Sequence, residues 1–191
     1  MAKPREIAFI DGTVDAIDAL LLGLRPEVDA IVLSRSERAT SQIARTLQDR
    51  EEIEAVHIIA HGCPGEVSFG AGPLSLENIG ESAADLHLAG QAIGKGGNIA
   101  LWICAAGQGE SGSAFVKALA RATNANIAAA TGPVGSPARG GGWELDITSV
   151  GKNFAAPALS LMLYQRVSGC SARRSWNGAS KAGRRWSGSR R

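Results

Sequence analysis

Cysteine is scarce in this chain, and long apolar runs are missing from it. Three cysteines, Cys63, Cys104 and Cys170, occur among 191 residues, too few and too irregularly spaced for a disulfide framework. No Cys-x-x-Cys pair or His/Cys cluster has the spacing of a zinc site, so we expect no structural metal. No apolar run reaches the roughly 20 residues that cross a bilayer, which predicts that no segment spans a membrane.

Acidic residues are missing from the end of the chain. Of 20 basic residues, seven lie in residues 171–191 without an acidic one, so the rest has 13 basic against 18 acidic residues. This basic Arg/Ser/Gly/Trp tail lacks apolar periodicity and is expected to be disordered. Arginines interleaved with Trp176 and Trp186 are typical of segments that bind single-stranded nucleic acid or an anionic membrane surface. A tail without function is the alternative.

The body of the chain alternates apolar runs of strand length with helix-like segments. Such alternation predicts βαβ units around a parallel sheet. The strands are apolar rather than alternating in polarity, which is typical of a sheet covered on both faces. We therefore expect residues 1–150 to form one α/β domain, a three-layer sandwich with a mostly parallel sheet in a flavodoxin-like strand arrangement.

The expected elements follow from these patterns. Strands are predicted at 6–10, 28–33, 53–60, 98–103, 126–130 and 143–147, with a hairpin around 67–76. Helices are predicted at 14–22 after a Thr13 cap, from Ser36 or Thr40 to about 47, at 76–93 and at 113–122. Residues 151–170 are expected to add one more packed helix, at 154–167.

Two of the predicted strands end in residues that carry chemistry. One ends at Cys104 and another at His61-Gly62. If these strands are parallel neighbours, a thiol and an imidazole emerge at the sheet edge where chemistry collects. We interpret Cys104 as a candidate nucleophile and His61 as the base that nucleophilic cysteine catalysis needs. Backbone N–H groups of Gly62 and Cys104 would stabilise an oxyanion. A buried core cysteine and a turn histidine are the alternatives.

Other polar residues are weighed against this pair. His57 lies inside a predicted strand and is expected to be a hydrogen-bonded structural residue, while His87 should face water on a helix. Asp11 ends the first strand and, with Glu110, is a candidate for binding a basic substrate residue. An Asx-turn or helix cap before Thr13 is the alternative role for Asp11.

Residues 107–112 read Gly-Gln-Gly-Glu-Ser-Gly, a G-x-G-x-x-G pattern between a strand and a helix. The pattern is typical of dinucleotide binding. However, no acidic residue lies between Glu110 and Glu144, where a ribose-binding carboxylate is expected. A glycine-rich turn that lines the thiol site is the simpler interpretation, and we expect no cofactor.

Three stretches together resemble a known family. They are H-I-I-A-H-G-C-P-G-E-V-S-F-G at 57–70, A-L-W-I-C-A-A-G-Q-G-E-S-G-S-A-F-V at 100–116 and G-G-G-W-E-L at 140–145. They are similar to the bacterial family called domain of unknown function 4347, over about residues 7–147. That family typically occurs near the start of very large adhesin-like surface proteins, and it resembles the caspase/gingipain-like fold of clan CD cysteine peptidases. The resemblance implies His61 as general base and acid, Cys104 as nucleophile and Gly62 as a backbone oxyanion donor.

The chain departs from the family pattern beside these residues. Ile103 stands where a glycine is usual, Ala105-Ala106 where Asn-Val is common, and Cys63 where a serine is usual. Bulk at Ile103 would narrow a pocket at the thiol. A member that keeps the fold without the chemistry therefore stays open.

Two functions from different classes result. The first is a cysteine peptidase that cleaves a protein or peptide, its own chain included, through a thioester. The second is a non-catalytic interaction module of surface or secreted proteins, and nucleotide binding at the glycine-rich turn is a third. The N-terminus enters a strand pattern at once and shows no secretory signal, which predicts the cytoplasm by default, whereas the resemblance implies the cell surface or secretion.

Overall fold

A computed structural model of the chain describes residues 5–150, and most of its strands lie in one six-stranded sheet. Their order is β2-β1-β3-β7-β8-β9. These strands are β1 (Glu6–Asp11), β2 (Val28–Leu33), β3 (Ile53–Ile59), β7 (Ile93–Trp102), β8 (Asn126–Ala129) and β9 (Ile147–Thr148). All neighbours are parallel except β8 and β9. The five parallel strands have the flavodoxin-like order, so the predicted α/β class is confirmed.

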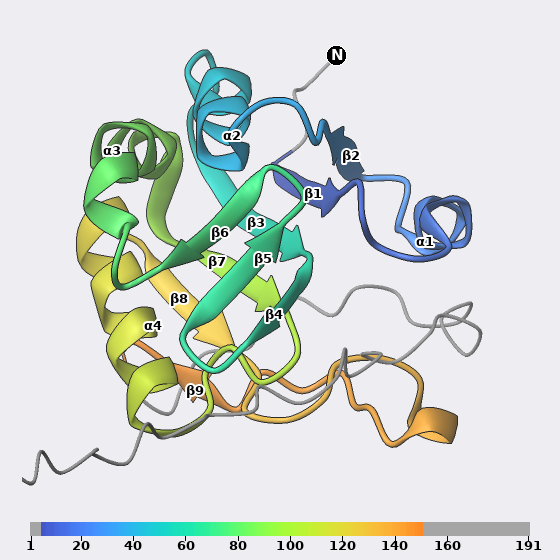
Figure 1. The fold of residues 1–191 in the computed structure, drawn as a ribbon. Coiled ribbons are helices and arrows are strands. Elements are labelled where there is room, and N and C mark those ends of the chain that lie inside the picture. Colours follow the sequence, from blue (N-terminus) through green and yellow to red (C-terminus); the bar gives the residue numbers. More distant parts are fainter. Residues whose placement is uncertain (1–4, 151–191) are drawn as a thin grey trace, which may run out of the picture.

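Helices and loops cover both faces of the sheet. The helices are α1 (Ile17–Gly23), α2 (Ala39–Leu47), α3 (Ala83–Gln91) and α4 (Gly109–Thr123), with short 3-10 turns at Ile79–Ser82 and Pro137–Arg139. Figure 1 shows α2, α3 and α4 together on one side and α1 apart from them on the other. Neighbouring residues of a strand face opposite layers, so Phe9 lies in the larger core under α2 to α4 and Ile10 in the smaller one near α1. Within residues 5–150, every helix is too short or too polar to span a bilayer.

A second, antiparallel sheet follows β3. It consists of β4 (His61–Cys63), β5 (Glu66–Phe69) and β6 (Gly72–Ser75). The predicted hairpin is confirmed as β5 and β6, whereas β4 was not predicted. Val67, Phe69 and Leu74 pack into the larger core, which seats this small sheet on the main one. His61 is therefore the first residue of a strand and does not lie in a loop.

Several predicted boundaries are wrong for local reasons. The first helix begins at Ile17 and not at residue 14, because Thr13 bonds to Asp11 and Ala16 adopts a left-handed φ of 54°. The helix predicted from residue 76 begins only at Ala83, after β6 and a 3-10 turn. These segments follow turn geometry and not the apolar spacing that predicted them.

The C-terminal part of the domain also differs from the prediction. Residues 143–146 do not form a strand, and β9 covers only Ile147–Thr148. Trp143 packs on Trp102 instead, with ring centroids 6.0 Å apart, and so closes the smaller core. The helix predicted at 154–167 and the basic tail at 171–191 lie outside the described residues.

Candidate functional site

Strand β7 leads Cys104 to the carboxyl edge of the sheet. Strands β3 and β7 are parallel neighbours with Ile59 opposite Trp102. The segments that follow the two strands therefore leave the sheet at the same edge. Cys104 lies two residues after β7 and is half-buried. Ala105 then adopts a φ of 54°, a left-handed conformation that is uncommon for residues other than glycine. This tight turn directs the chain toward α4.

The thiol of Cys104 is bonded to the backbone of Val134. The Val134 N–H donates to Sγ at 3.4 Å, and Sγ donates to the Val134 carbonyl oxygen at 3.6 Å. The N–H of Ala105 donates to the Gly132 carbonyl at 2.8 Å. The loop after β8 therefore lies along the turn that carries the thiol.

This loop, residues 131–146, is closed at its base by Asp146. The carboxylate accepts hydrogen bonds from the Thr131 N–H at 2.7 Å and from the Thr131 hydroxyl. Burial raises the pKa of Asp146, but the hydrogen bonds from Thr131 and the backbone outweigh it and hold that pKa below its ordinary value. The ionised carboxylate thus fixes both ends of the loop.

His61, at the start of β4, is half-buried and bonded through one ring nitrogen. Its Nε2 lies 3.2 Å from the Thr13 carbonyl oxygen. Because a carbonyl oxygen only accepts, Nε2 carries the proton in this contact and Nδ1 keeps its lone pair. Within residues 5–150 no hydrogen bond involves Nδ1. With respect to the described residues, the imidazole therefore has an available acceptor, as a general base requires.

The segments that carry His61 and Cys104 are in direct contact. A Cβ added to Gly62 would lie 2.4 Å from Cγ2 of Ile103, so only glycine fits next to His61. The Gly65 N–H also donates to the Ala106 carbonyl at 3.0 Å. In the described part of the chain, no hydrogen bond joins the imidazole to the thiol. The two side chains thus belong to touching segments but have separate backbone partners.

The candidate oxyanion donors lie outside the strand ladders. Cys63 and Glu66 flank a two-residue turn and form a hydrogen-bonded pair, which leaves Gly62, opposite Val67, at a non-hydrogen-bonded position. Its N–H therefore points away from β5. The Cys104 N–H makes no hydrogen bond within residues 5–150. Among residues 5–150, both donors that the sequence suggests are thus without a hydrogen-bond acceptor.

The two acidic candidates have different surroundings. Asp11 is 1% exposed, and its carboxylate accepts hydrogen bonds from the N–H groups of Thr13 and Gly70, both at 2.9 Å. It thus forms the Asx-turn given above as its alternative role. Glu110 is exposed on the first turn of α4 and lines a hollow of about 430 Å³ that neither His61 nor Cys104 lines. The structure connects Asp11 to His61 through Thr13. It shows no such connection between Glu110 and His61 among the described residues.

His57 is a structural residue and His87 is exposed on α3, as predicted. Trp102 donates its indole N–H to Nδ1 of His57 at 3.1 Å, and Nε2 lies 3.4 Å from a Glu6 carboxylate oxygen. Burial lowers the pKa of His57, although Glu6 opposes this effect. His57 therefore stays neutral and holds β1, β3 and β7 together.

Packing accounts for two glycines of the G-x-G-x-x-G turn, and a left-handed φ of 67° accounts for the third, Gly109. A Cβ on Gly107 would lie 2.3 Å from Cγ2 of Ile147, and one on Gly112 would lie 2.2 Å from the Gly107 backbone. The turn and α4 therefore need these glycines without any bound phosphate. Among the described residues, no three His, Cys, Asp or Glu side chains gather closely enough to hold a metal ion.

Two partners of the candidate residues escaped the sequence analysis. They are the Thr13 carbonyl, which binds His61, and the Val134 backbone, which binds Cys104. Both contribute only backbone atoms, which every residue type has, so no sequence pattern could have identified them.

One comparison with known proteins gave a match. A family model described as "Domain of unknown function (DUF4347)" matches residues 7–167, a range that includes His61 and Cys104. Comparison with curated proteins and with solved structures gave no match.

Proposed function

The chain belongs to the family described as domain of unknown function 4347, and on this premise we propose a cysteine peptidase-like function in which His61 and Cys104 form the catalytic pair. The proposal includes a caspase-like relationship of the fold. The observation that carries it is the state of His61. Its Nε2 is bonded to the Thr13 carbonyl, and Nδ1 stays an acceptor at the edge to which β7 leads Cys104.

The proposed reaction needs only groups of this chain and water. Nδ1 of His61 takes the proton of the Cys104 thiol, and the sulfur bonds to the peptide carbonyl carbon. The oxyanion is stabilised by the N–H groups of Gly62 and Cys104. The C–N bond then breaks, the leaving amine takes the proton from His61, and a thioester remains. Water, deprotonated by His61, attacks the thioester and releases the acid and the thiol.

The resting thiol must first leave Val134. Sγ donates to the Val134 carbonyl, so its proton is directed away from the imidazole. Rotation of the Cys104 side chain would free this proton for Nδ1. We assign this rotation to substrate binding, in which the backbone of a peptide would replace the thiol at the N–H and carbonyl of Val134.

The proposed substrate is a protein or peptide. Asp11 already uses both carboxylate oxygens, which leaves Glu110 as the acidic candidate for binding a basic substrate residue, in a hollow that neither His61 nor Cys104 lines. The resemblance to domains near the start of large adhesin-like surface proteins supports cleavage of the polypeptide that contains the domain. Contacts with nucleic acid or an anionic surface are assigned to the basic tail alone.

A non-catalytic interaction module is the second candidate. It is favoured by the bonding of the thiol to Val134 in place of His61, and by the Ile103 side chain against Gly62. A domain of this kind keeps Cys104 as a structural group of the β7–α4 turn.

Thiol labelling followed by intact-mass spectrometry and peptide mapping tests the proposal. A peptidyl electrophile is titrated against the Cys63→Ala protein, and against the same protein with Cys104→Ala, His61→Ala or His87→Ala. A general base contributes roughly 10²- to 10⁴-fold, so we expect His61→Ala to slow labelling at Cys104 at least tenfold. His87→Ala, on the exposed face of α3, should leave the rate unchanged.

Equal labelling of Cys104 with and without His61 would contradict the peptidase proposal and support the interaction module. Labelling confined to Cys170 would have the same consequence, because it would show that the electrophile cannot reach Cys104.

A further inference from the structure

Asp11 is a buried carboxylate for which the proposed reaction has no use. It is 1% exposed, and a buried carboxylate is costly unless hydrogen bonds satisfy it. Its Oδ1 accepts bonds from the N–H and the hydroxyl of Thr13, and its Oδ2 accepts one from the Gly70 N–H. The side chain thus joins the turn after β1 to the turn between β5 and β6.

Both of these turns support His61. The first turn presents the Thr13 carbonyl to Nε2 of His61 at 3.2 Å. The second turn ends β5, in which Ser68 pairs with His61 of β4. The Asp11 carboxylate therefore fixes two parts of the backbone. One is the turn whose carbonyl binds Nε2 of His61, and the other is the end of β5, the strand that pairs with His61.

Arg35 bonds to the same turn through the Gly12 carbonyl. Its Nε donates to the Gly12 carbonyl at 3.0 Å, and a second guanidinium nitrogen donates to the same oxygen. Arg35 also lies against Gly70, where a Cβ would meet the Arg35 and Thr13 side chains at 2.9 Å. The turn is therefore hydrogen-bonded to both a carboxylate and a guanidinium.

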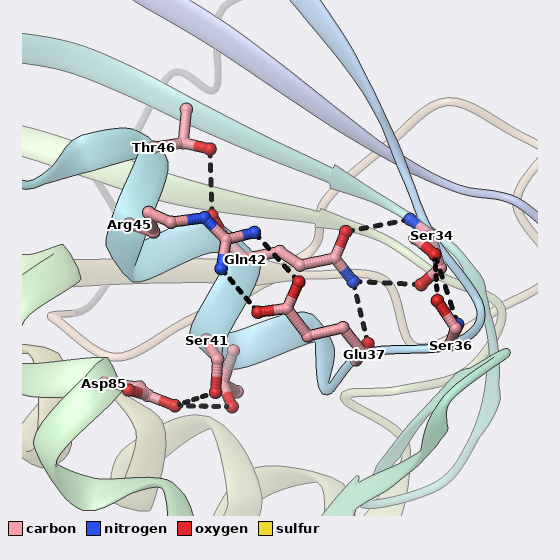
Figure 2. A network of polar contacts seen from close by, with 9 residues as sticks. Ser34, Ser36, Glu37, Ser41, Gln42, Arg45, Thr46 and Asp85 are labelled. Carbon is pink, nitrogen blue, oxygen red and sulfur yellow. Dashed lines mark hydrogen bonds and ion pairs between the residues drawn. The ribbon is translucent and has the colours of Figure 1, made fainter.

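The loop that carries Arg35 is itself fixed by the buried Gln42 of α2 (Figure 2). The Gln42 side-chain oxygen accepts the Ser34 N–H at 2.8 Å, and its amide donates to the Ser34 and Glu37 carbonyls at 2.9 and 2.7 Å. A continuous series of contacts thus runs from α2 through Arg35 and the turn to His61.

From this arrangement we infer that Asp11 is a positioning residue for His61. It holds the Thr13 carbonyl where it binds the Nε2 proton, which keeps Nδ1 as the acceptor. Arg35 assists by fixing the Gly12 carbonyl. The benefit for catalysis rests on the proposed function, whereas the effect on the imidazole does not.

The tautomer of His61 is the direct measurement. In ¹⁵N NMR spectra of the Cys104→Ala protein, recorded under conditions in which the imidazole is neutral, we expect His61 to carry its proton on Nε2. Asp11→Asn removes the acceptor for the Gly70 N–H and should shift the signals toward a mixture of both tautomers. Arg35→Gln, at an exposed position, should give the same shift to a smaller extent.

Asp85→Asn is the matched control. The Asp85 carboxylate accepts bonds from Ser41 and Thr40 between α2 and α3 (Figure 2) and has no contact with the turn. It should lower stability and leave the His61 tautomer unchanged. The inference is overturned if Asp11→Asn and Arg35→Gln leave the tautomer as it is, or if Asp85→Asn changes it equally.

A second readout separates this inference from the proposed function. With Cys104 restored, Asp11→Asn should slow labelling of Cys104 about tenfold, which corresponds to about 1.4 kcal/mol. If the tautomer shifts but labelling depends on neither His61 nor Asp11, the positioning role stands and the peptidase function fails.

Discussion

Two histidines that lie four residues apart in the sequence have opposite surroundings. His57, inside β3, is fully buried and has a partner at each ring nitrogen, Trp102 and Glu6. His61, at the start of β4, is half-buried and is bonded only at Nε2 within the described residues. A ring with both nitrogens occupied can join strands but cannot take a proton from a neighbour. The core region around His57 should therefore tolerate few substitutions, whereas the edge region around His61 has a ring nitrogen that can accept a proton.

The largest effect expected from this comparison is on stability. His57→Ala leaves a cavity and an unpaired Trp102 indole N–H, and it should lower the free energy of unfolding by about 2–5 kcal/mol. His61→Ala, at a half-exposed site, should lower it by less than about 1 kcal/mol. Urea unfolding at pH 7.5 measures both. Equal losses would break the distinction between the two regions.

Gly62→Ala tests whether the edge region around His61 accepts a larger side chain without loss of stability. The added methyl would meet Cγ2 of Ile103 at 2.4 Å and the Glu66 carbonyl at 2.5 Å, so overpacking should cost about 1–3 kcal/mol. Gly80→Ala, where no atom lies within 4 Å of the added methyl, should change stability by less than about 0.5 kcal/mol. Thermal or urea unfolding of both variants measures this. A neutral Gly62→Ala would mean that β4 can move away from Ile103.

The pH dependence of stability should come from the buried histidine. The pKa of His57 is lowered in the folded protein, so the unfolded chain binds more protons as the pH falls below about 6.5. Stability should therefore decrease toward pH 5.5, by up to about 1.4 kcal/mol per pH unit. Urea unfolding between pH 7.5 and 5.5 should show this slope in wild type and in His87→Gln, but not in His57→Gln. A slope that survives in His57→Gln would belong to other groups.

The smallest effect is expected at the turn after Cys104. Ala105 has a φ of 54°, which glycine adopts without the penalty of a side chain, so Ala105→Gly should raise stability by about 0.5–1 kcal/mol. The same substitution at Ala118, inside α4, should lower stability by a similar amount. Melting temperatures of the two variants should thus move in opposite directions. A loss at both positions would mean that residue 105 leaves the left-handed region in solution.

The sequence predicted the parallel strands of the main sheet because their signals are local. The strand at Val28–Leu33 agrees at both ends, since an apolar run between turn residues is sufficient to predict it. The prediction missed β4, whose three residues, His61 to Cys63, contain no apolar alternation. That strand forms only because β5 lies beside it and Gly62 allows close contact with Ile103. The sequence shows that residue 62 is a glycine. It does not show that a larger side chain there would collide with Ile103.

The candidate site divides in the same way. The sequence by itself determined that a thiol and an imidazole follow two apolar strands, because strand length and residue type are properties of the local chain. Only the tertiary structure decided that Asp11 supports the turn beside His61, that His61 binds the Thr13 carbonyl, and that Cys104 binds Val134. Each of these contacts joins a side chain to a backbone N–H or carbonyl group of a segment that is distant in the sequence. Such atoms are common to all residues, so only their positions in the folded chain distinguish them.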